Sequence, residues 1–140
     1  MAETAKTRPG TMHLADALQY RLPLAGVVSI LHRASGAILF VLLPFIIWMF
    51  DTSVTSEISF GRFTSAFVAG IGFVPAWLVK LAVLALIWAY LHHFIAGLRH
   101  LWMDATHSVS KEFGRQSALV TLAASGVLTV LLGAKLFGLY

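Results

Sequence analysis

The segment LAVLALIWAYLHHFIAGL (residues 81–98) decides the fold, because none of its residues is Asp, Glu, Lys or Arg. A transmembrane helix needs about 20 predominantly apolar residues to cross about 30 Å of hydrocarbon. Two further uncharged segments, residues 34–50 and 116–134, stand before and after it, and the first two reach spanning length with their flanks. The sequence therefore predicts an all-α integral membrane protein with three transmembrane helices, at about residues 24–50, 74–103 and 115–138.

The composition supports a membrane protein and excludes several kinds of site. Of the 140 residues, 59% are hydrophobic and only 11% are charged, which is too few charges for the surface of a soluble domain. The net charge of +4 is too small and too scattered for a nucleic-acid partner. Cysteine is absent, which excludes disulfides, thiolate-bound iron–sulfur clusters and thioether-linked haem. A metal centre would therefore need His, carboxylate or Met ligands.

The N-terminal region, residues 1–21, is polar and contains the helix-breaking pair Pro9-Gly10. It lacks the apolar core of a secretory signal and the Arg-rich amphipathic pattern of a mitochondrial presequence. We expect a cytoplasmic arm on a single domain, residues 1–140, in a bacterial cytoplasmic (inner) membrane.

The distribution of Lys and Arg predicts the orientation. Three of the ten lie in the first loop, at the start of the second span or near the C-terminus: Arg62, Lys80 and Lys135. The other seven lie in the arm, near the first span or around the second loop: Lys6, Arg8, Arg21, Arg33, Arg99, Lys111 and Arg115. By the positive-inside rule, the N-terminus is cytoplasmic and the C-terminus periplasmic.

A first polar group interrupts the first span in the sequence SILHRASG, residues 29–36. Ser29, His32, Arg33 and Gly36 are spaced i, i+3, i+4 and i+7, so they share one helical face. One interpretation is that the long side chains reach toward the lipid headgroups. The other is that the face binds a polar or anionic ligand, such as a carboxylate or a quinone oxygen.

A second polar group lies at the end of the second span. His93, Gly97 and His100 share a face, and Gly97 would leave room for a flat group beside His93. A buried neutral imidazole suits axial ligation of haem iron, with Arg33, His32 and His100 at the depth of its propionates, whereas Arg99 should approach the interface. The alternative is a histidine that only hydrogen-bonds another helix. His92 points about 100° away, and spacing alone does not exclude it as the ligand.

The chain resembles a known family, the small three-helix cytochrome b membrane-anchor subunits of succinate dehydrogenase, respiratory complex II. The resemblance rests on Arg8-Pro9, on YRLPL (residues 20–24) and on two longer motifs. These are Ser29-x-x-His32-Arg33-x-Ser35-Gly36 and His93-x-x-x-Gly97-Leu98-Arg99-His100-Leu101-x-Met103-Asp104.

The resemblance implies a role for each motif residue. Ser29 and Arg33 fall at the ubiquinone site, and His93 is the axial ligand of the haem b iron. His32 and Arg33, together with His100, approach the haem propionates.

The resemblance also implies that the chain has no succinate chemistry of its own. In the tricarboxylic acid cycle and the electron-transport chain, a flavoprotein subunit oxidises succinate and an iron–sulfur subunit passes the electrons to quinone in the membrane. The present chain would dock these two subunits and share the haem with a second three-helix membrane subunit, which supplies the other axial ligand. The two membrane subunits would pack as one bundle in the lipid.

Three alternatives remain open at this point. The chain could anchor a quinol-oxidising fumarate reductase, which has the same architecture working in reverse. It could be a haem-free transporter or proton-relay subunit that uses His92, His93 and His100, or it could be a purely structural anchor. A b-type haem spectrum would separate the first from the other two.

Overall fold

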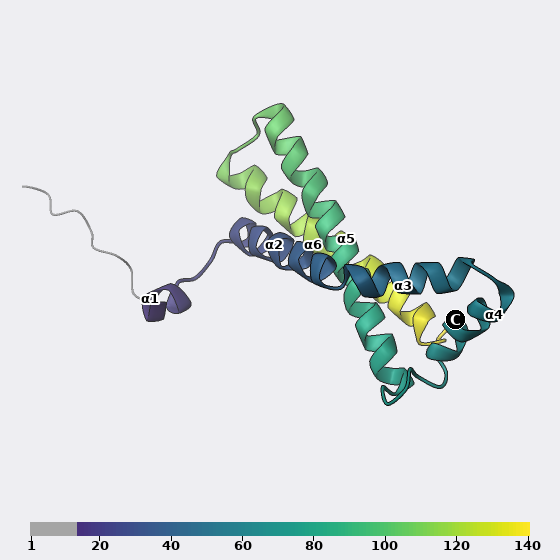
Figure 1. Ribbon diagram of the computed structural model, residues 1–140. Helices are drawn as coiled ribbons and strands as arrows, with labels where there is room; N and C mark the ends of the chain where they lie inside the picture. The colour runs from purple at the N-terminus through teal and green to yellow at the C-terminus, as the bar shows by residue number, and fades with distance from the viewer. Residues whose placement is uncertain (1–13) are drawn as a thin grey trace, which may run out of the picture.

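The structure is a computed structural model that describes residues 14–140, in which every regular element is a helix (Figure 1). Of the expected cytoplasmic arm, residues 1–13, with Lys6 and Arg8, lie outside the described residues. The helices are, in chain order, α1 (Leu14–Gln19), α2 (Leu24–Val41), α3 (Leu43–Val54), α4 (Glu57–Ala66), α5 (Ala76–Thr106) and α6 (Lys111–Leu136).

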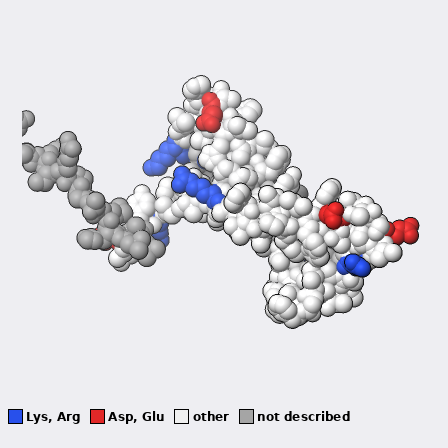
Figure 2. Space-filling view, in the orientation of Figure 1, with Lys and Arg blue, Asp and Glu red and all other residues white. Residues whose placement is uncertain are grey.

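Three of these helices, α2, α5 and α6, are long and apolar enough to cross a membrane, which confirms the prediction of a three-span, multi-pass membrane protein. Figure 2 shows charged side chains toward the two ends of the molecule and a broad uncharged band between them. We call the end where α2 begins, α5 ends and α6 begins the α5–α6 end. The opposite end, which carries α4 and the start of α5, is the α4 end.

The first span is divided, whereas a single helix was expected over residues 24–50. Leu42 separates α2 from α3, and Pro44 lies in the first turn of α3. Proline has no N–H to donate, and its ring clashes with the carbonyl four residues earlier. Hydrogen bonds from Leu42 N to Ile38 O and from Ile46 N to Leu42 O, each 3.0 Å, maintain helical bonding on both sides. The chain therefore continues past the break as α3 (Figure 1).

The other two spans begin and end where the local sequence provides caps. Pro75 precedes α5, and His107 ends it in the left-handed conformation with φ 53°. The Ser110 side chain accepts from Phe113 N at 3.2 Å, so α6 begins at Lys111 and not at the expected residue 115. The first turns of α6 consequently carry charged residues at the α5–α6 end.

The core lies where α2, α5 and α6 meet, since each of these helices contacts the other two. Val28, Ala96 and Ala118, one from each helix, form its fully buried centre. Small side chains at these positions let the backbones approach closely, as is typical of membrane bundles. Many large apolar side chains remain exposed outside this core, among them Phe40, Phe94 and Val127. Such surface is suited to lipid or to another membrane chain.

Candidate functional site

His93 lies at the contact between α2 and α5, toward the α5–α6 end of the bundle, and is half-buried. Its Nδ1 is 3.0 Å from the carbonyl oxygen of His32 and 3.3 Å from Ser35 Oγ. A carbonyl oxygen only accepts hydrogen bonds, so this bond places the proton on Nδ1. Nε2 is then left with a free lone pair, which is the form of imidazole that binds a metal.

Three histidine rings gather around this point, and we call His32, His93 and His100 the histidine cluster. The His32 ring stacks on His93, with centroids 4.2 Å apart and planes 15° apart. The His100 ring is 5.2 Å from His32 at an angle of 45°. The sequence placed His93 deeper in the span than His32 and His100, and the structure brings all three rings together.

Two glycines let the histidine rings fit between the helices. A Cβ on Gly36 would lie 2.8 Å from His93 Cε1, so only glycine leaves room for that ring against α2. A Cβ on Gly97 would be 3.6 Å from His32 Nε2. Gly97 was expected to leave space beside His93, but in this structure it faces the His32 ring.

Ser29 and Arg33, the expected quinone-site residues, lie on α2 beside the histidine cluster in the sequence. Ser29 is half-buried, and Arg33 is exposed. An exposed guanidinium at this position points out of the chain rather than into its core. A site formed by these two residues would therefore be completed by another molecule.

His92 occupies a different environment from His93, although the two are adjacent in the sequence. It is fully buried, stacks on Trp88 with ring centroids 5.5 Å apart, and has Nδ1 3.2 Å from Ser125 Oγ on α6. Its Nε2 is buried with no hydrogen-bond partner among the described residues. Complete burial inside the bundle leaves no opening for a flat ligand, so the geometry favours His93 over His92 as a ligand-binding histidine.

Arg99, which was expected to approach the membrane interface, packs against the first turns of α6. It is 8% exposed; Nε donates to Ser117 Oγ at 2.9 Å and Nη2 donates to the Gly114 carbonyl at 3.3 Å. Sequence spacing could not find these partners, because a helix position does not reveal which neighbouring helix a long side chain follows.

The histidine cluster fits an iron ion only if the iron brings most of its other ligands with it. Within residues 14–140, no three or more His, Asp or Glu side chains are arranged to hold a metal ion. The stacked rings of His32 and His93 lie face to face, so their nitrogens do not converge on one point. A metal that brings its own equatorial ligands needs only one histidine from this chain, and haem iron is such a metal. His93, with Nδ1 engaged and Nε2 free, fits that requirement.

Ser35 and Gly36 belong to the first polar motif, but their spacing predicted no individual role for either. The structure shows that Ser35 is fully buried and that its hydroxyl donates to the His32 carbonyl at 2.9 Å, beside His93. The available signal was the position of Gly36 on the polar face of the first span. A glycine on a face that must approach another helix indicates close packing.

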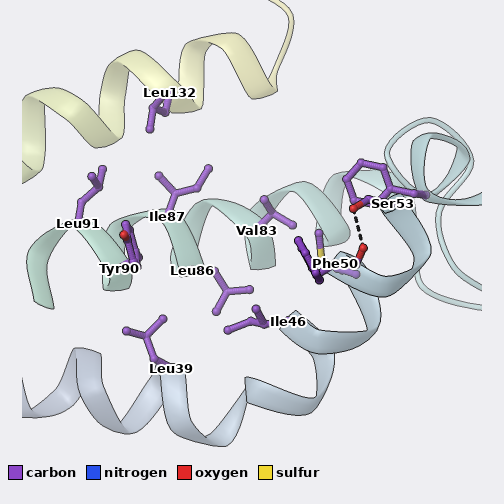
Figure 3. A pocket seen from close by; sticks show the side chains of 12 residues that line it. Leu39, Ile46, Phe50, Ser53, Val83, Leu86, Ile87, Tyr90, Leu91 and Leu132 are labelled. Atoms are coloured by element: carbon purple, nitrogen blue, oxygen red, sulfur yellow. Dashed lines mark hydrogen bonds between the residues drawn. The ribbon is translucent and has the colours of Figure 1, made fainter. Parts of the chain in front are cut away.

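A cavity lies away from the histidine cluster. It has a volume of about 480 Å³ and lies toward the α4 end, between α2, α3 and α5, with Leu132 of α6 at one side (Figure 3). Its walls are almost entirely apolar; Ser53 and the Tyr90 hydroxyl are the exceptions.

Comparison with known proteins gives a consistent result. Residues 4–132 match the family described as Succinate dehydrogenase/Fumarate reductase transmembrane subunit. The succinate dehydrogenase cytochrome b556 subunit of Paracoccus denitrificans is 35% identical over 128 residues, covering 91% of this chain and 93% of the relative. That of Coxiella burnetii is 32% identical over 118 residues, 84% of this chain and 90% of the relative. That of Rickettsia felis is 25% identical over 130 residues, 93% of this chain and 94% of the relative.

The family match covers the first two spans, most of the third and both polar motifs, and the relatives are subunits of an oxidoreductase complex. From the apolar helices, the histidine cluster and these similarities, we conclude that the chain belongs to the succinate dehydrogenase/fumarate reductase transmembrane subunit family, as a cytochrome b membrane-anchor subunit of succinate dehydrogenase.

Proposed function

We propose that this chain binds haem b through His93, contributes Ser29 and Arg33 to a ubiquinone site, and docks the subunits that oxidise succinate. The relatives are named cytochrome b556 subunits, and this name supports the haem. The observation that carries the proposal is the bond from His93 Nδ1 to the His32 carbonyl, which leaves Nε2 free.

Haem b, when bound, supplies a one-electron redox centre. His93 would hold the iron, and the His32 carbonyl and Ser35 fix the orientation of its ring. A hydrogen bond to the second nitrogen of a ligating histidine sets its tautomer and strengthens it as a ligand. The exposed Arg33 and the rings of His32 and His100 are the groups that we assign to the propionates.

Gly97 belongs to this pocket through His32. A Cβ at Gly97 would lie in ordinary contact with His32 Nε2, at 3.6 Å. In our proposal Gly97 forms the wall of the haem pocket beside the His32 ring.

Ser29 and Arg33 act on the quinone in our proposal. The Ser29 hydroxyl donates a hydrogen bond to a quinone carbonyl oxygen and fixes the ring. Negative charge develops on the quinone oxygens as electrons arrive, and the Arg33 guanidinium stabilises it. Both residues are accessible from outside the chain, so the electrons can come from an iron–sulfur subunit docked at the α5–α6 end.

The proposed partners follow from what this chain lacks. Of the three histidines in the cluster, we assign only His93 to the iron, so a second three-helix membrane subunit would supply the other ligand. The exposed apolar side chains of the spans give that subunit a surface to pack against, and lipid covers the rest. We place the α5–α6 end on the cytoplasmic side, where the iron–sulfur and flavoprotein subunits dock, which puts the C-terminus in the periplasm.

The test compares two adjacent histidines in membranes that contain the assembled complex. His93→Phe should abolish the b-type reduced-minus-oxidised spectrum, whereas His92→Phe should retain it, since His92 is buried against Trp88 and Ser125. Immunodetection of the chain and dye-linked succinate oxidation would verify that each variant assembles. A normal spectrum in an assembled His93→Phe complex would overturn the assignment of the ligand.

A further inference from the structure

A large cavity lies at the α5–α6 end, apart from the histidine cluster. It has a volume of about 760 Å³ and is bounded by the start of α2, the end of α5 and the start of α6. None of its lining residues is a histidine or one of the proposed quinone-site residues. Leu24 and Met103 contribute to an apolar wall, while Arg99, Lys111, Arg115 and Glu112 provide the charges.

Arg99 is the unusual member of this lining, because its guanidinium is buried with no acidic partner among residues 14–140. Both hydrogen bonds that it makes within the described residues go to neutral oxygens, on Ser117 and Gly114. Its Nη1 makes no hydrogen bond there and is not among the buried unpaired atoms, so it keeps some exposure. Arg99 lines this cavity and also a smaller neighbouring one beside Trp102 and Phe113. A charge held within a transmembrane helix is expensive, and such residues usually serve a ligand or a pathway.

The surrounding charges favour an anion. Lys111 and Arg115 lie in the first turns of α6, whose N-terminal N–H groups carry partial positive charge. Glu112 is the opposing charge in the lining, and its carboxylate accepts a hydrogen bond from Gln116 at 3.3 Å. Three cations therefore face one anion. A guanidinium presents parallel donors that match a phosphate group.

The apolar wall shows what kind of anion fits. A soluble anion would gain nothing from Leu24 and Met103, whereas acyl chains would bury against them. The cavity also lies where α2 and α6 begin and α5 ends, which is the level of the lipid headgroups. Figure 2 shows Lys and Arg gathered toward this end of the molecule. Basic pockets between transmembrane helices are known to bind anionic lipid headgroups.

We propose that this cavity binds one anionic glycerophospholipid, with its phosphodiester held by Arg99, Lys111 and Arg115 and its acyl chains along the apolar wall. The site is separate from the haem and quinone positions and requires only that the chain spans the membrane. The bound lipid neutralises Arg99 and fills the gap between α2 and the α5–α6 turn.

The test uses the whole purified complex, delipidated in detergent and titrated with phosphatidylglycerol, phosphatidylcholine or inorganic phosphate. Native mass spectrometry counts the retained lipids, and thermal unfolding measures stabilisation by each added lipid. The variants are Arg99→Gln and the double variant Lys111→Gln/Arg115→Gln. The matched control is Arg62→Gln/Lys135→Gln, which removes the same charge from exposed positions elsewhere on the chain.

We expect the wild type and the control to retain one more phosphatidylglycerol molecule than either cavity variant. Their apparent affinity for this lipid should be at least fivefold higher than that of the variants. Because Lys111 and Arg115 are exposed, the double variant should fold even if Arg99→Gln does not.

Three results would overturn the proposal. The first is equal retention of phosphatidylglycerol by wild type and the double variant, or equal stabilisation of the wild type by phosphatidylcholine. The second is equal stabilisation by inorganic phosphate, which would show that the cavity holds a soluble anion. The third is loss of the iron–sulfur subunit from the double variant with lipid retention unchanged, which would assign the cations to a carboxylate of that subunit.

Discussion

Replacing Gly36 by alanine should disturb the proposed haem ligand without touching it chemically. The added Cβ would lie 2.8 Å from Cε1 and 3.2 Å from Nδ1 of His93. Carbon atoms prefer to be at least about 3.5 Å apart, so the ring must move by roughly 0.7 Å or the helices must separate. The imidazole cannot simply swing aside, because it is bonded to the His32 carbonyl and stacked on the His32 ring.

The cost of this change has two parts. Forcing an extra methyl group into a packed contact typically costs about 1–3 kcal/mol. Weakening the bond between His93 Nδ1 and the His32 carbonyl adds about 0.5–1.5 kcal/mol. If the substitution destabilises the haem-bound form by about 2 kcal/mol more than the haem-free form, haem affinity decreases more than tenfold, since 1.4 kcal/mol corresponds to a factor of ten.

The assay is the ratio of haem b to flavin in the purified complex, together with the reduced-minus-oxidised spectrum. Gly126→Ala is the matched control, because nothing lies within 4 Å of a Cβ at that helical position. Gly97→Ala is a second comparison, since its Cβ would make only ordinary contact with His32 at 3.6 Å. We expect a large loss of haem in Gly36→Ala, little change in Gly97→Ala and none in Gly126→Ala.

A Gly36→Ala complex with wild-type haem content and an unchanged spectrum would refute this reasoning. It would mean that α2 and α5 separate without cost, or that His93 does not hold the haem. A loss of haem in Gly126→Ala as large as in Gly36→Ala would show that the assay reports general instability instead.

Three further predictions concern other parts of the chain. Ser29→Ala and Arg33→Leu should each slow quinone reduction at least tenfold while succinate oxidation by an artificial dye is retained, because they remove groups that we assign to the quinone oxygens. Ser125→Ala should lower the free energy of unfolding by about 1–3 kcal/mol in thermal or denaturant unfolding, because it leaves both nitrogens of the buried His92 unpaired. His107→Gly should raise stability by up to about 1 kcal/mol, since its φ of 53° suits glycine.

Each of these has an outcome that would contradict it. Equal loss of quinone and dye activity would indicate failed assembly rather than a quinone site. A Ser125→Ala protein as stable as Thr64→Ala, an exposed Thr variant, would show that His92 finds another partner. A lower melting temperature for His107→Gly would mean that the histidine side chain stabilises the end of α5.

Much of the architecture could be predicted from the sequence because the membrane imposes strong rules. An uncharged run such as residues 81–98 must be helical in hydrocarbon, where every backbone N–H and C=O needs a partner within its own segment. Helical periodicity also separated the faces of His92 and His93 correctly, since adjacent residues differ by about 100°. The structure places His92 against α6 and His93 against α2.

Two local signals in the sequence indicate helix boundaries that differ from those of the three predicted spans. Pro44 indicates a break in the first span, and Ser110 indicates an earlier start for α6. Both effects act within one or two turns of the chain, so they belong to the sequence alone.

The sequence by itself determined the three spans, the two polar motifs and the helical face on which each motif residue lies. Only the tertiary structure decided which side chains meet. The contact of Gly36 with His93, the position of Gly97 against His32 and the burial of Arg99 against Ser117 all depend on how closely two helices approach. That distance is set by the packing of small residues from three helices around Val28, and no periodicity within one helix encodes it.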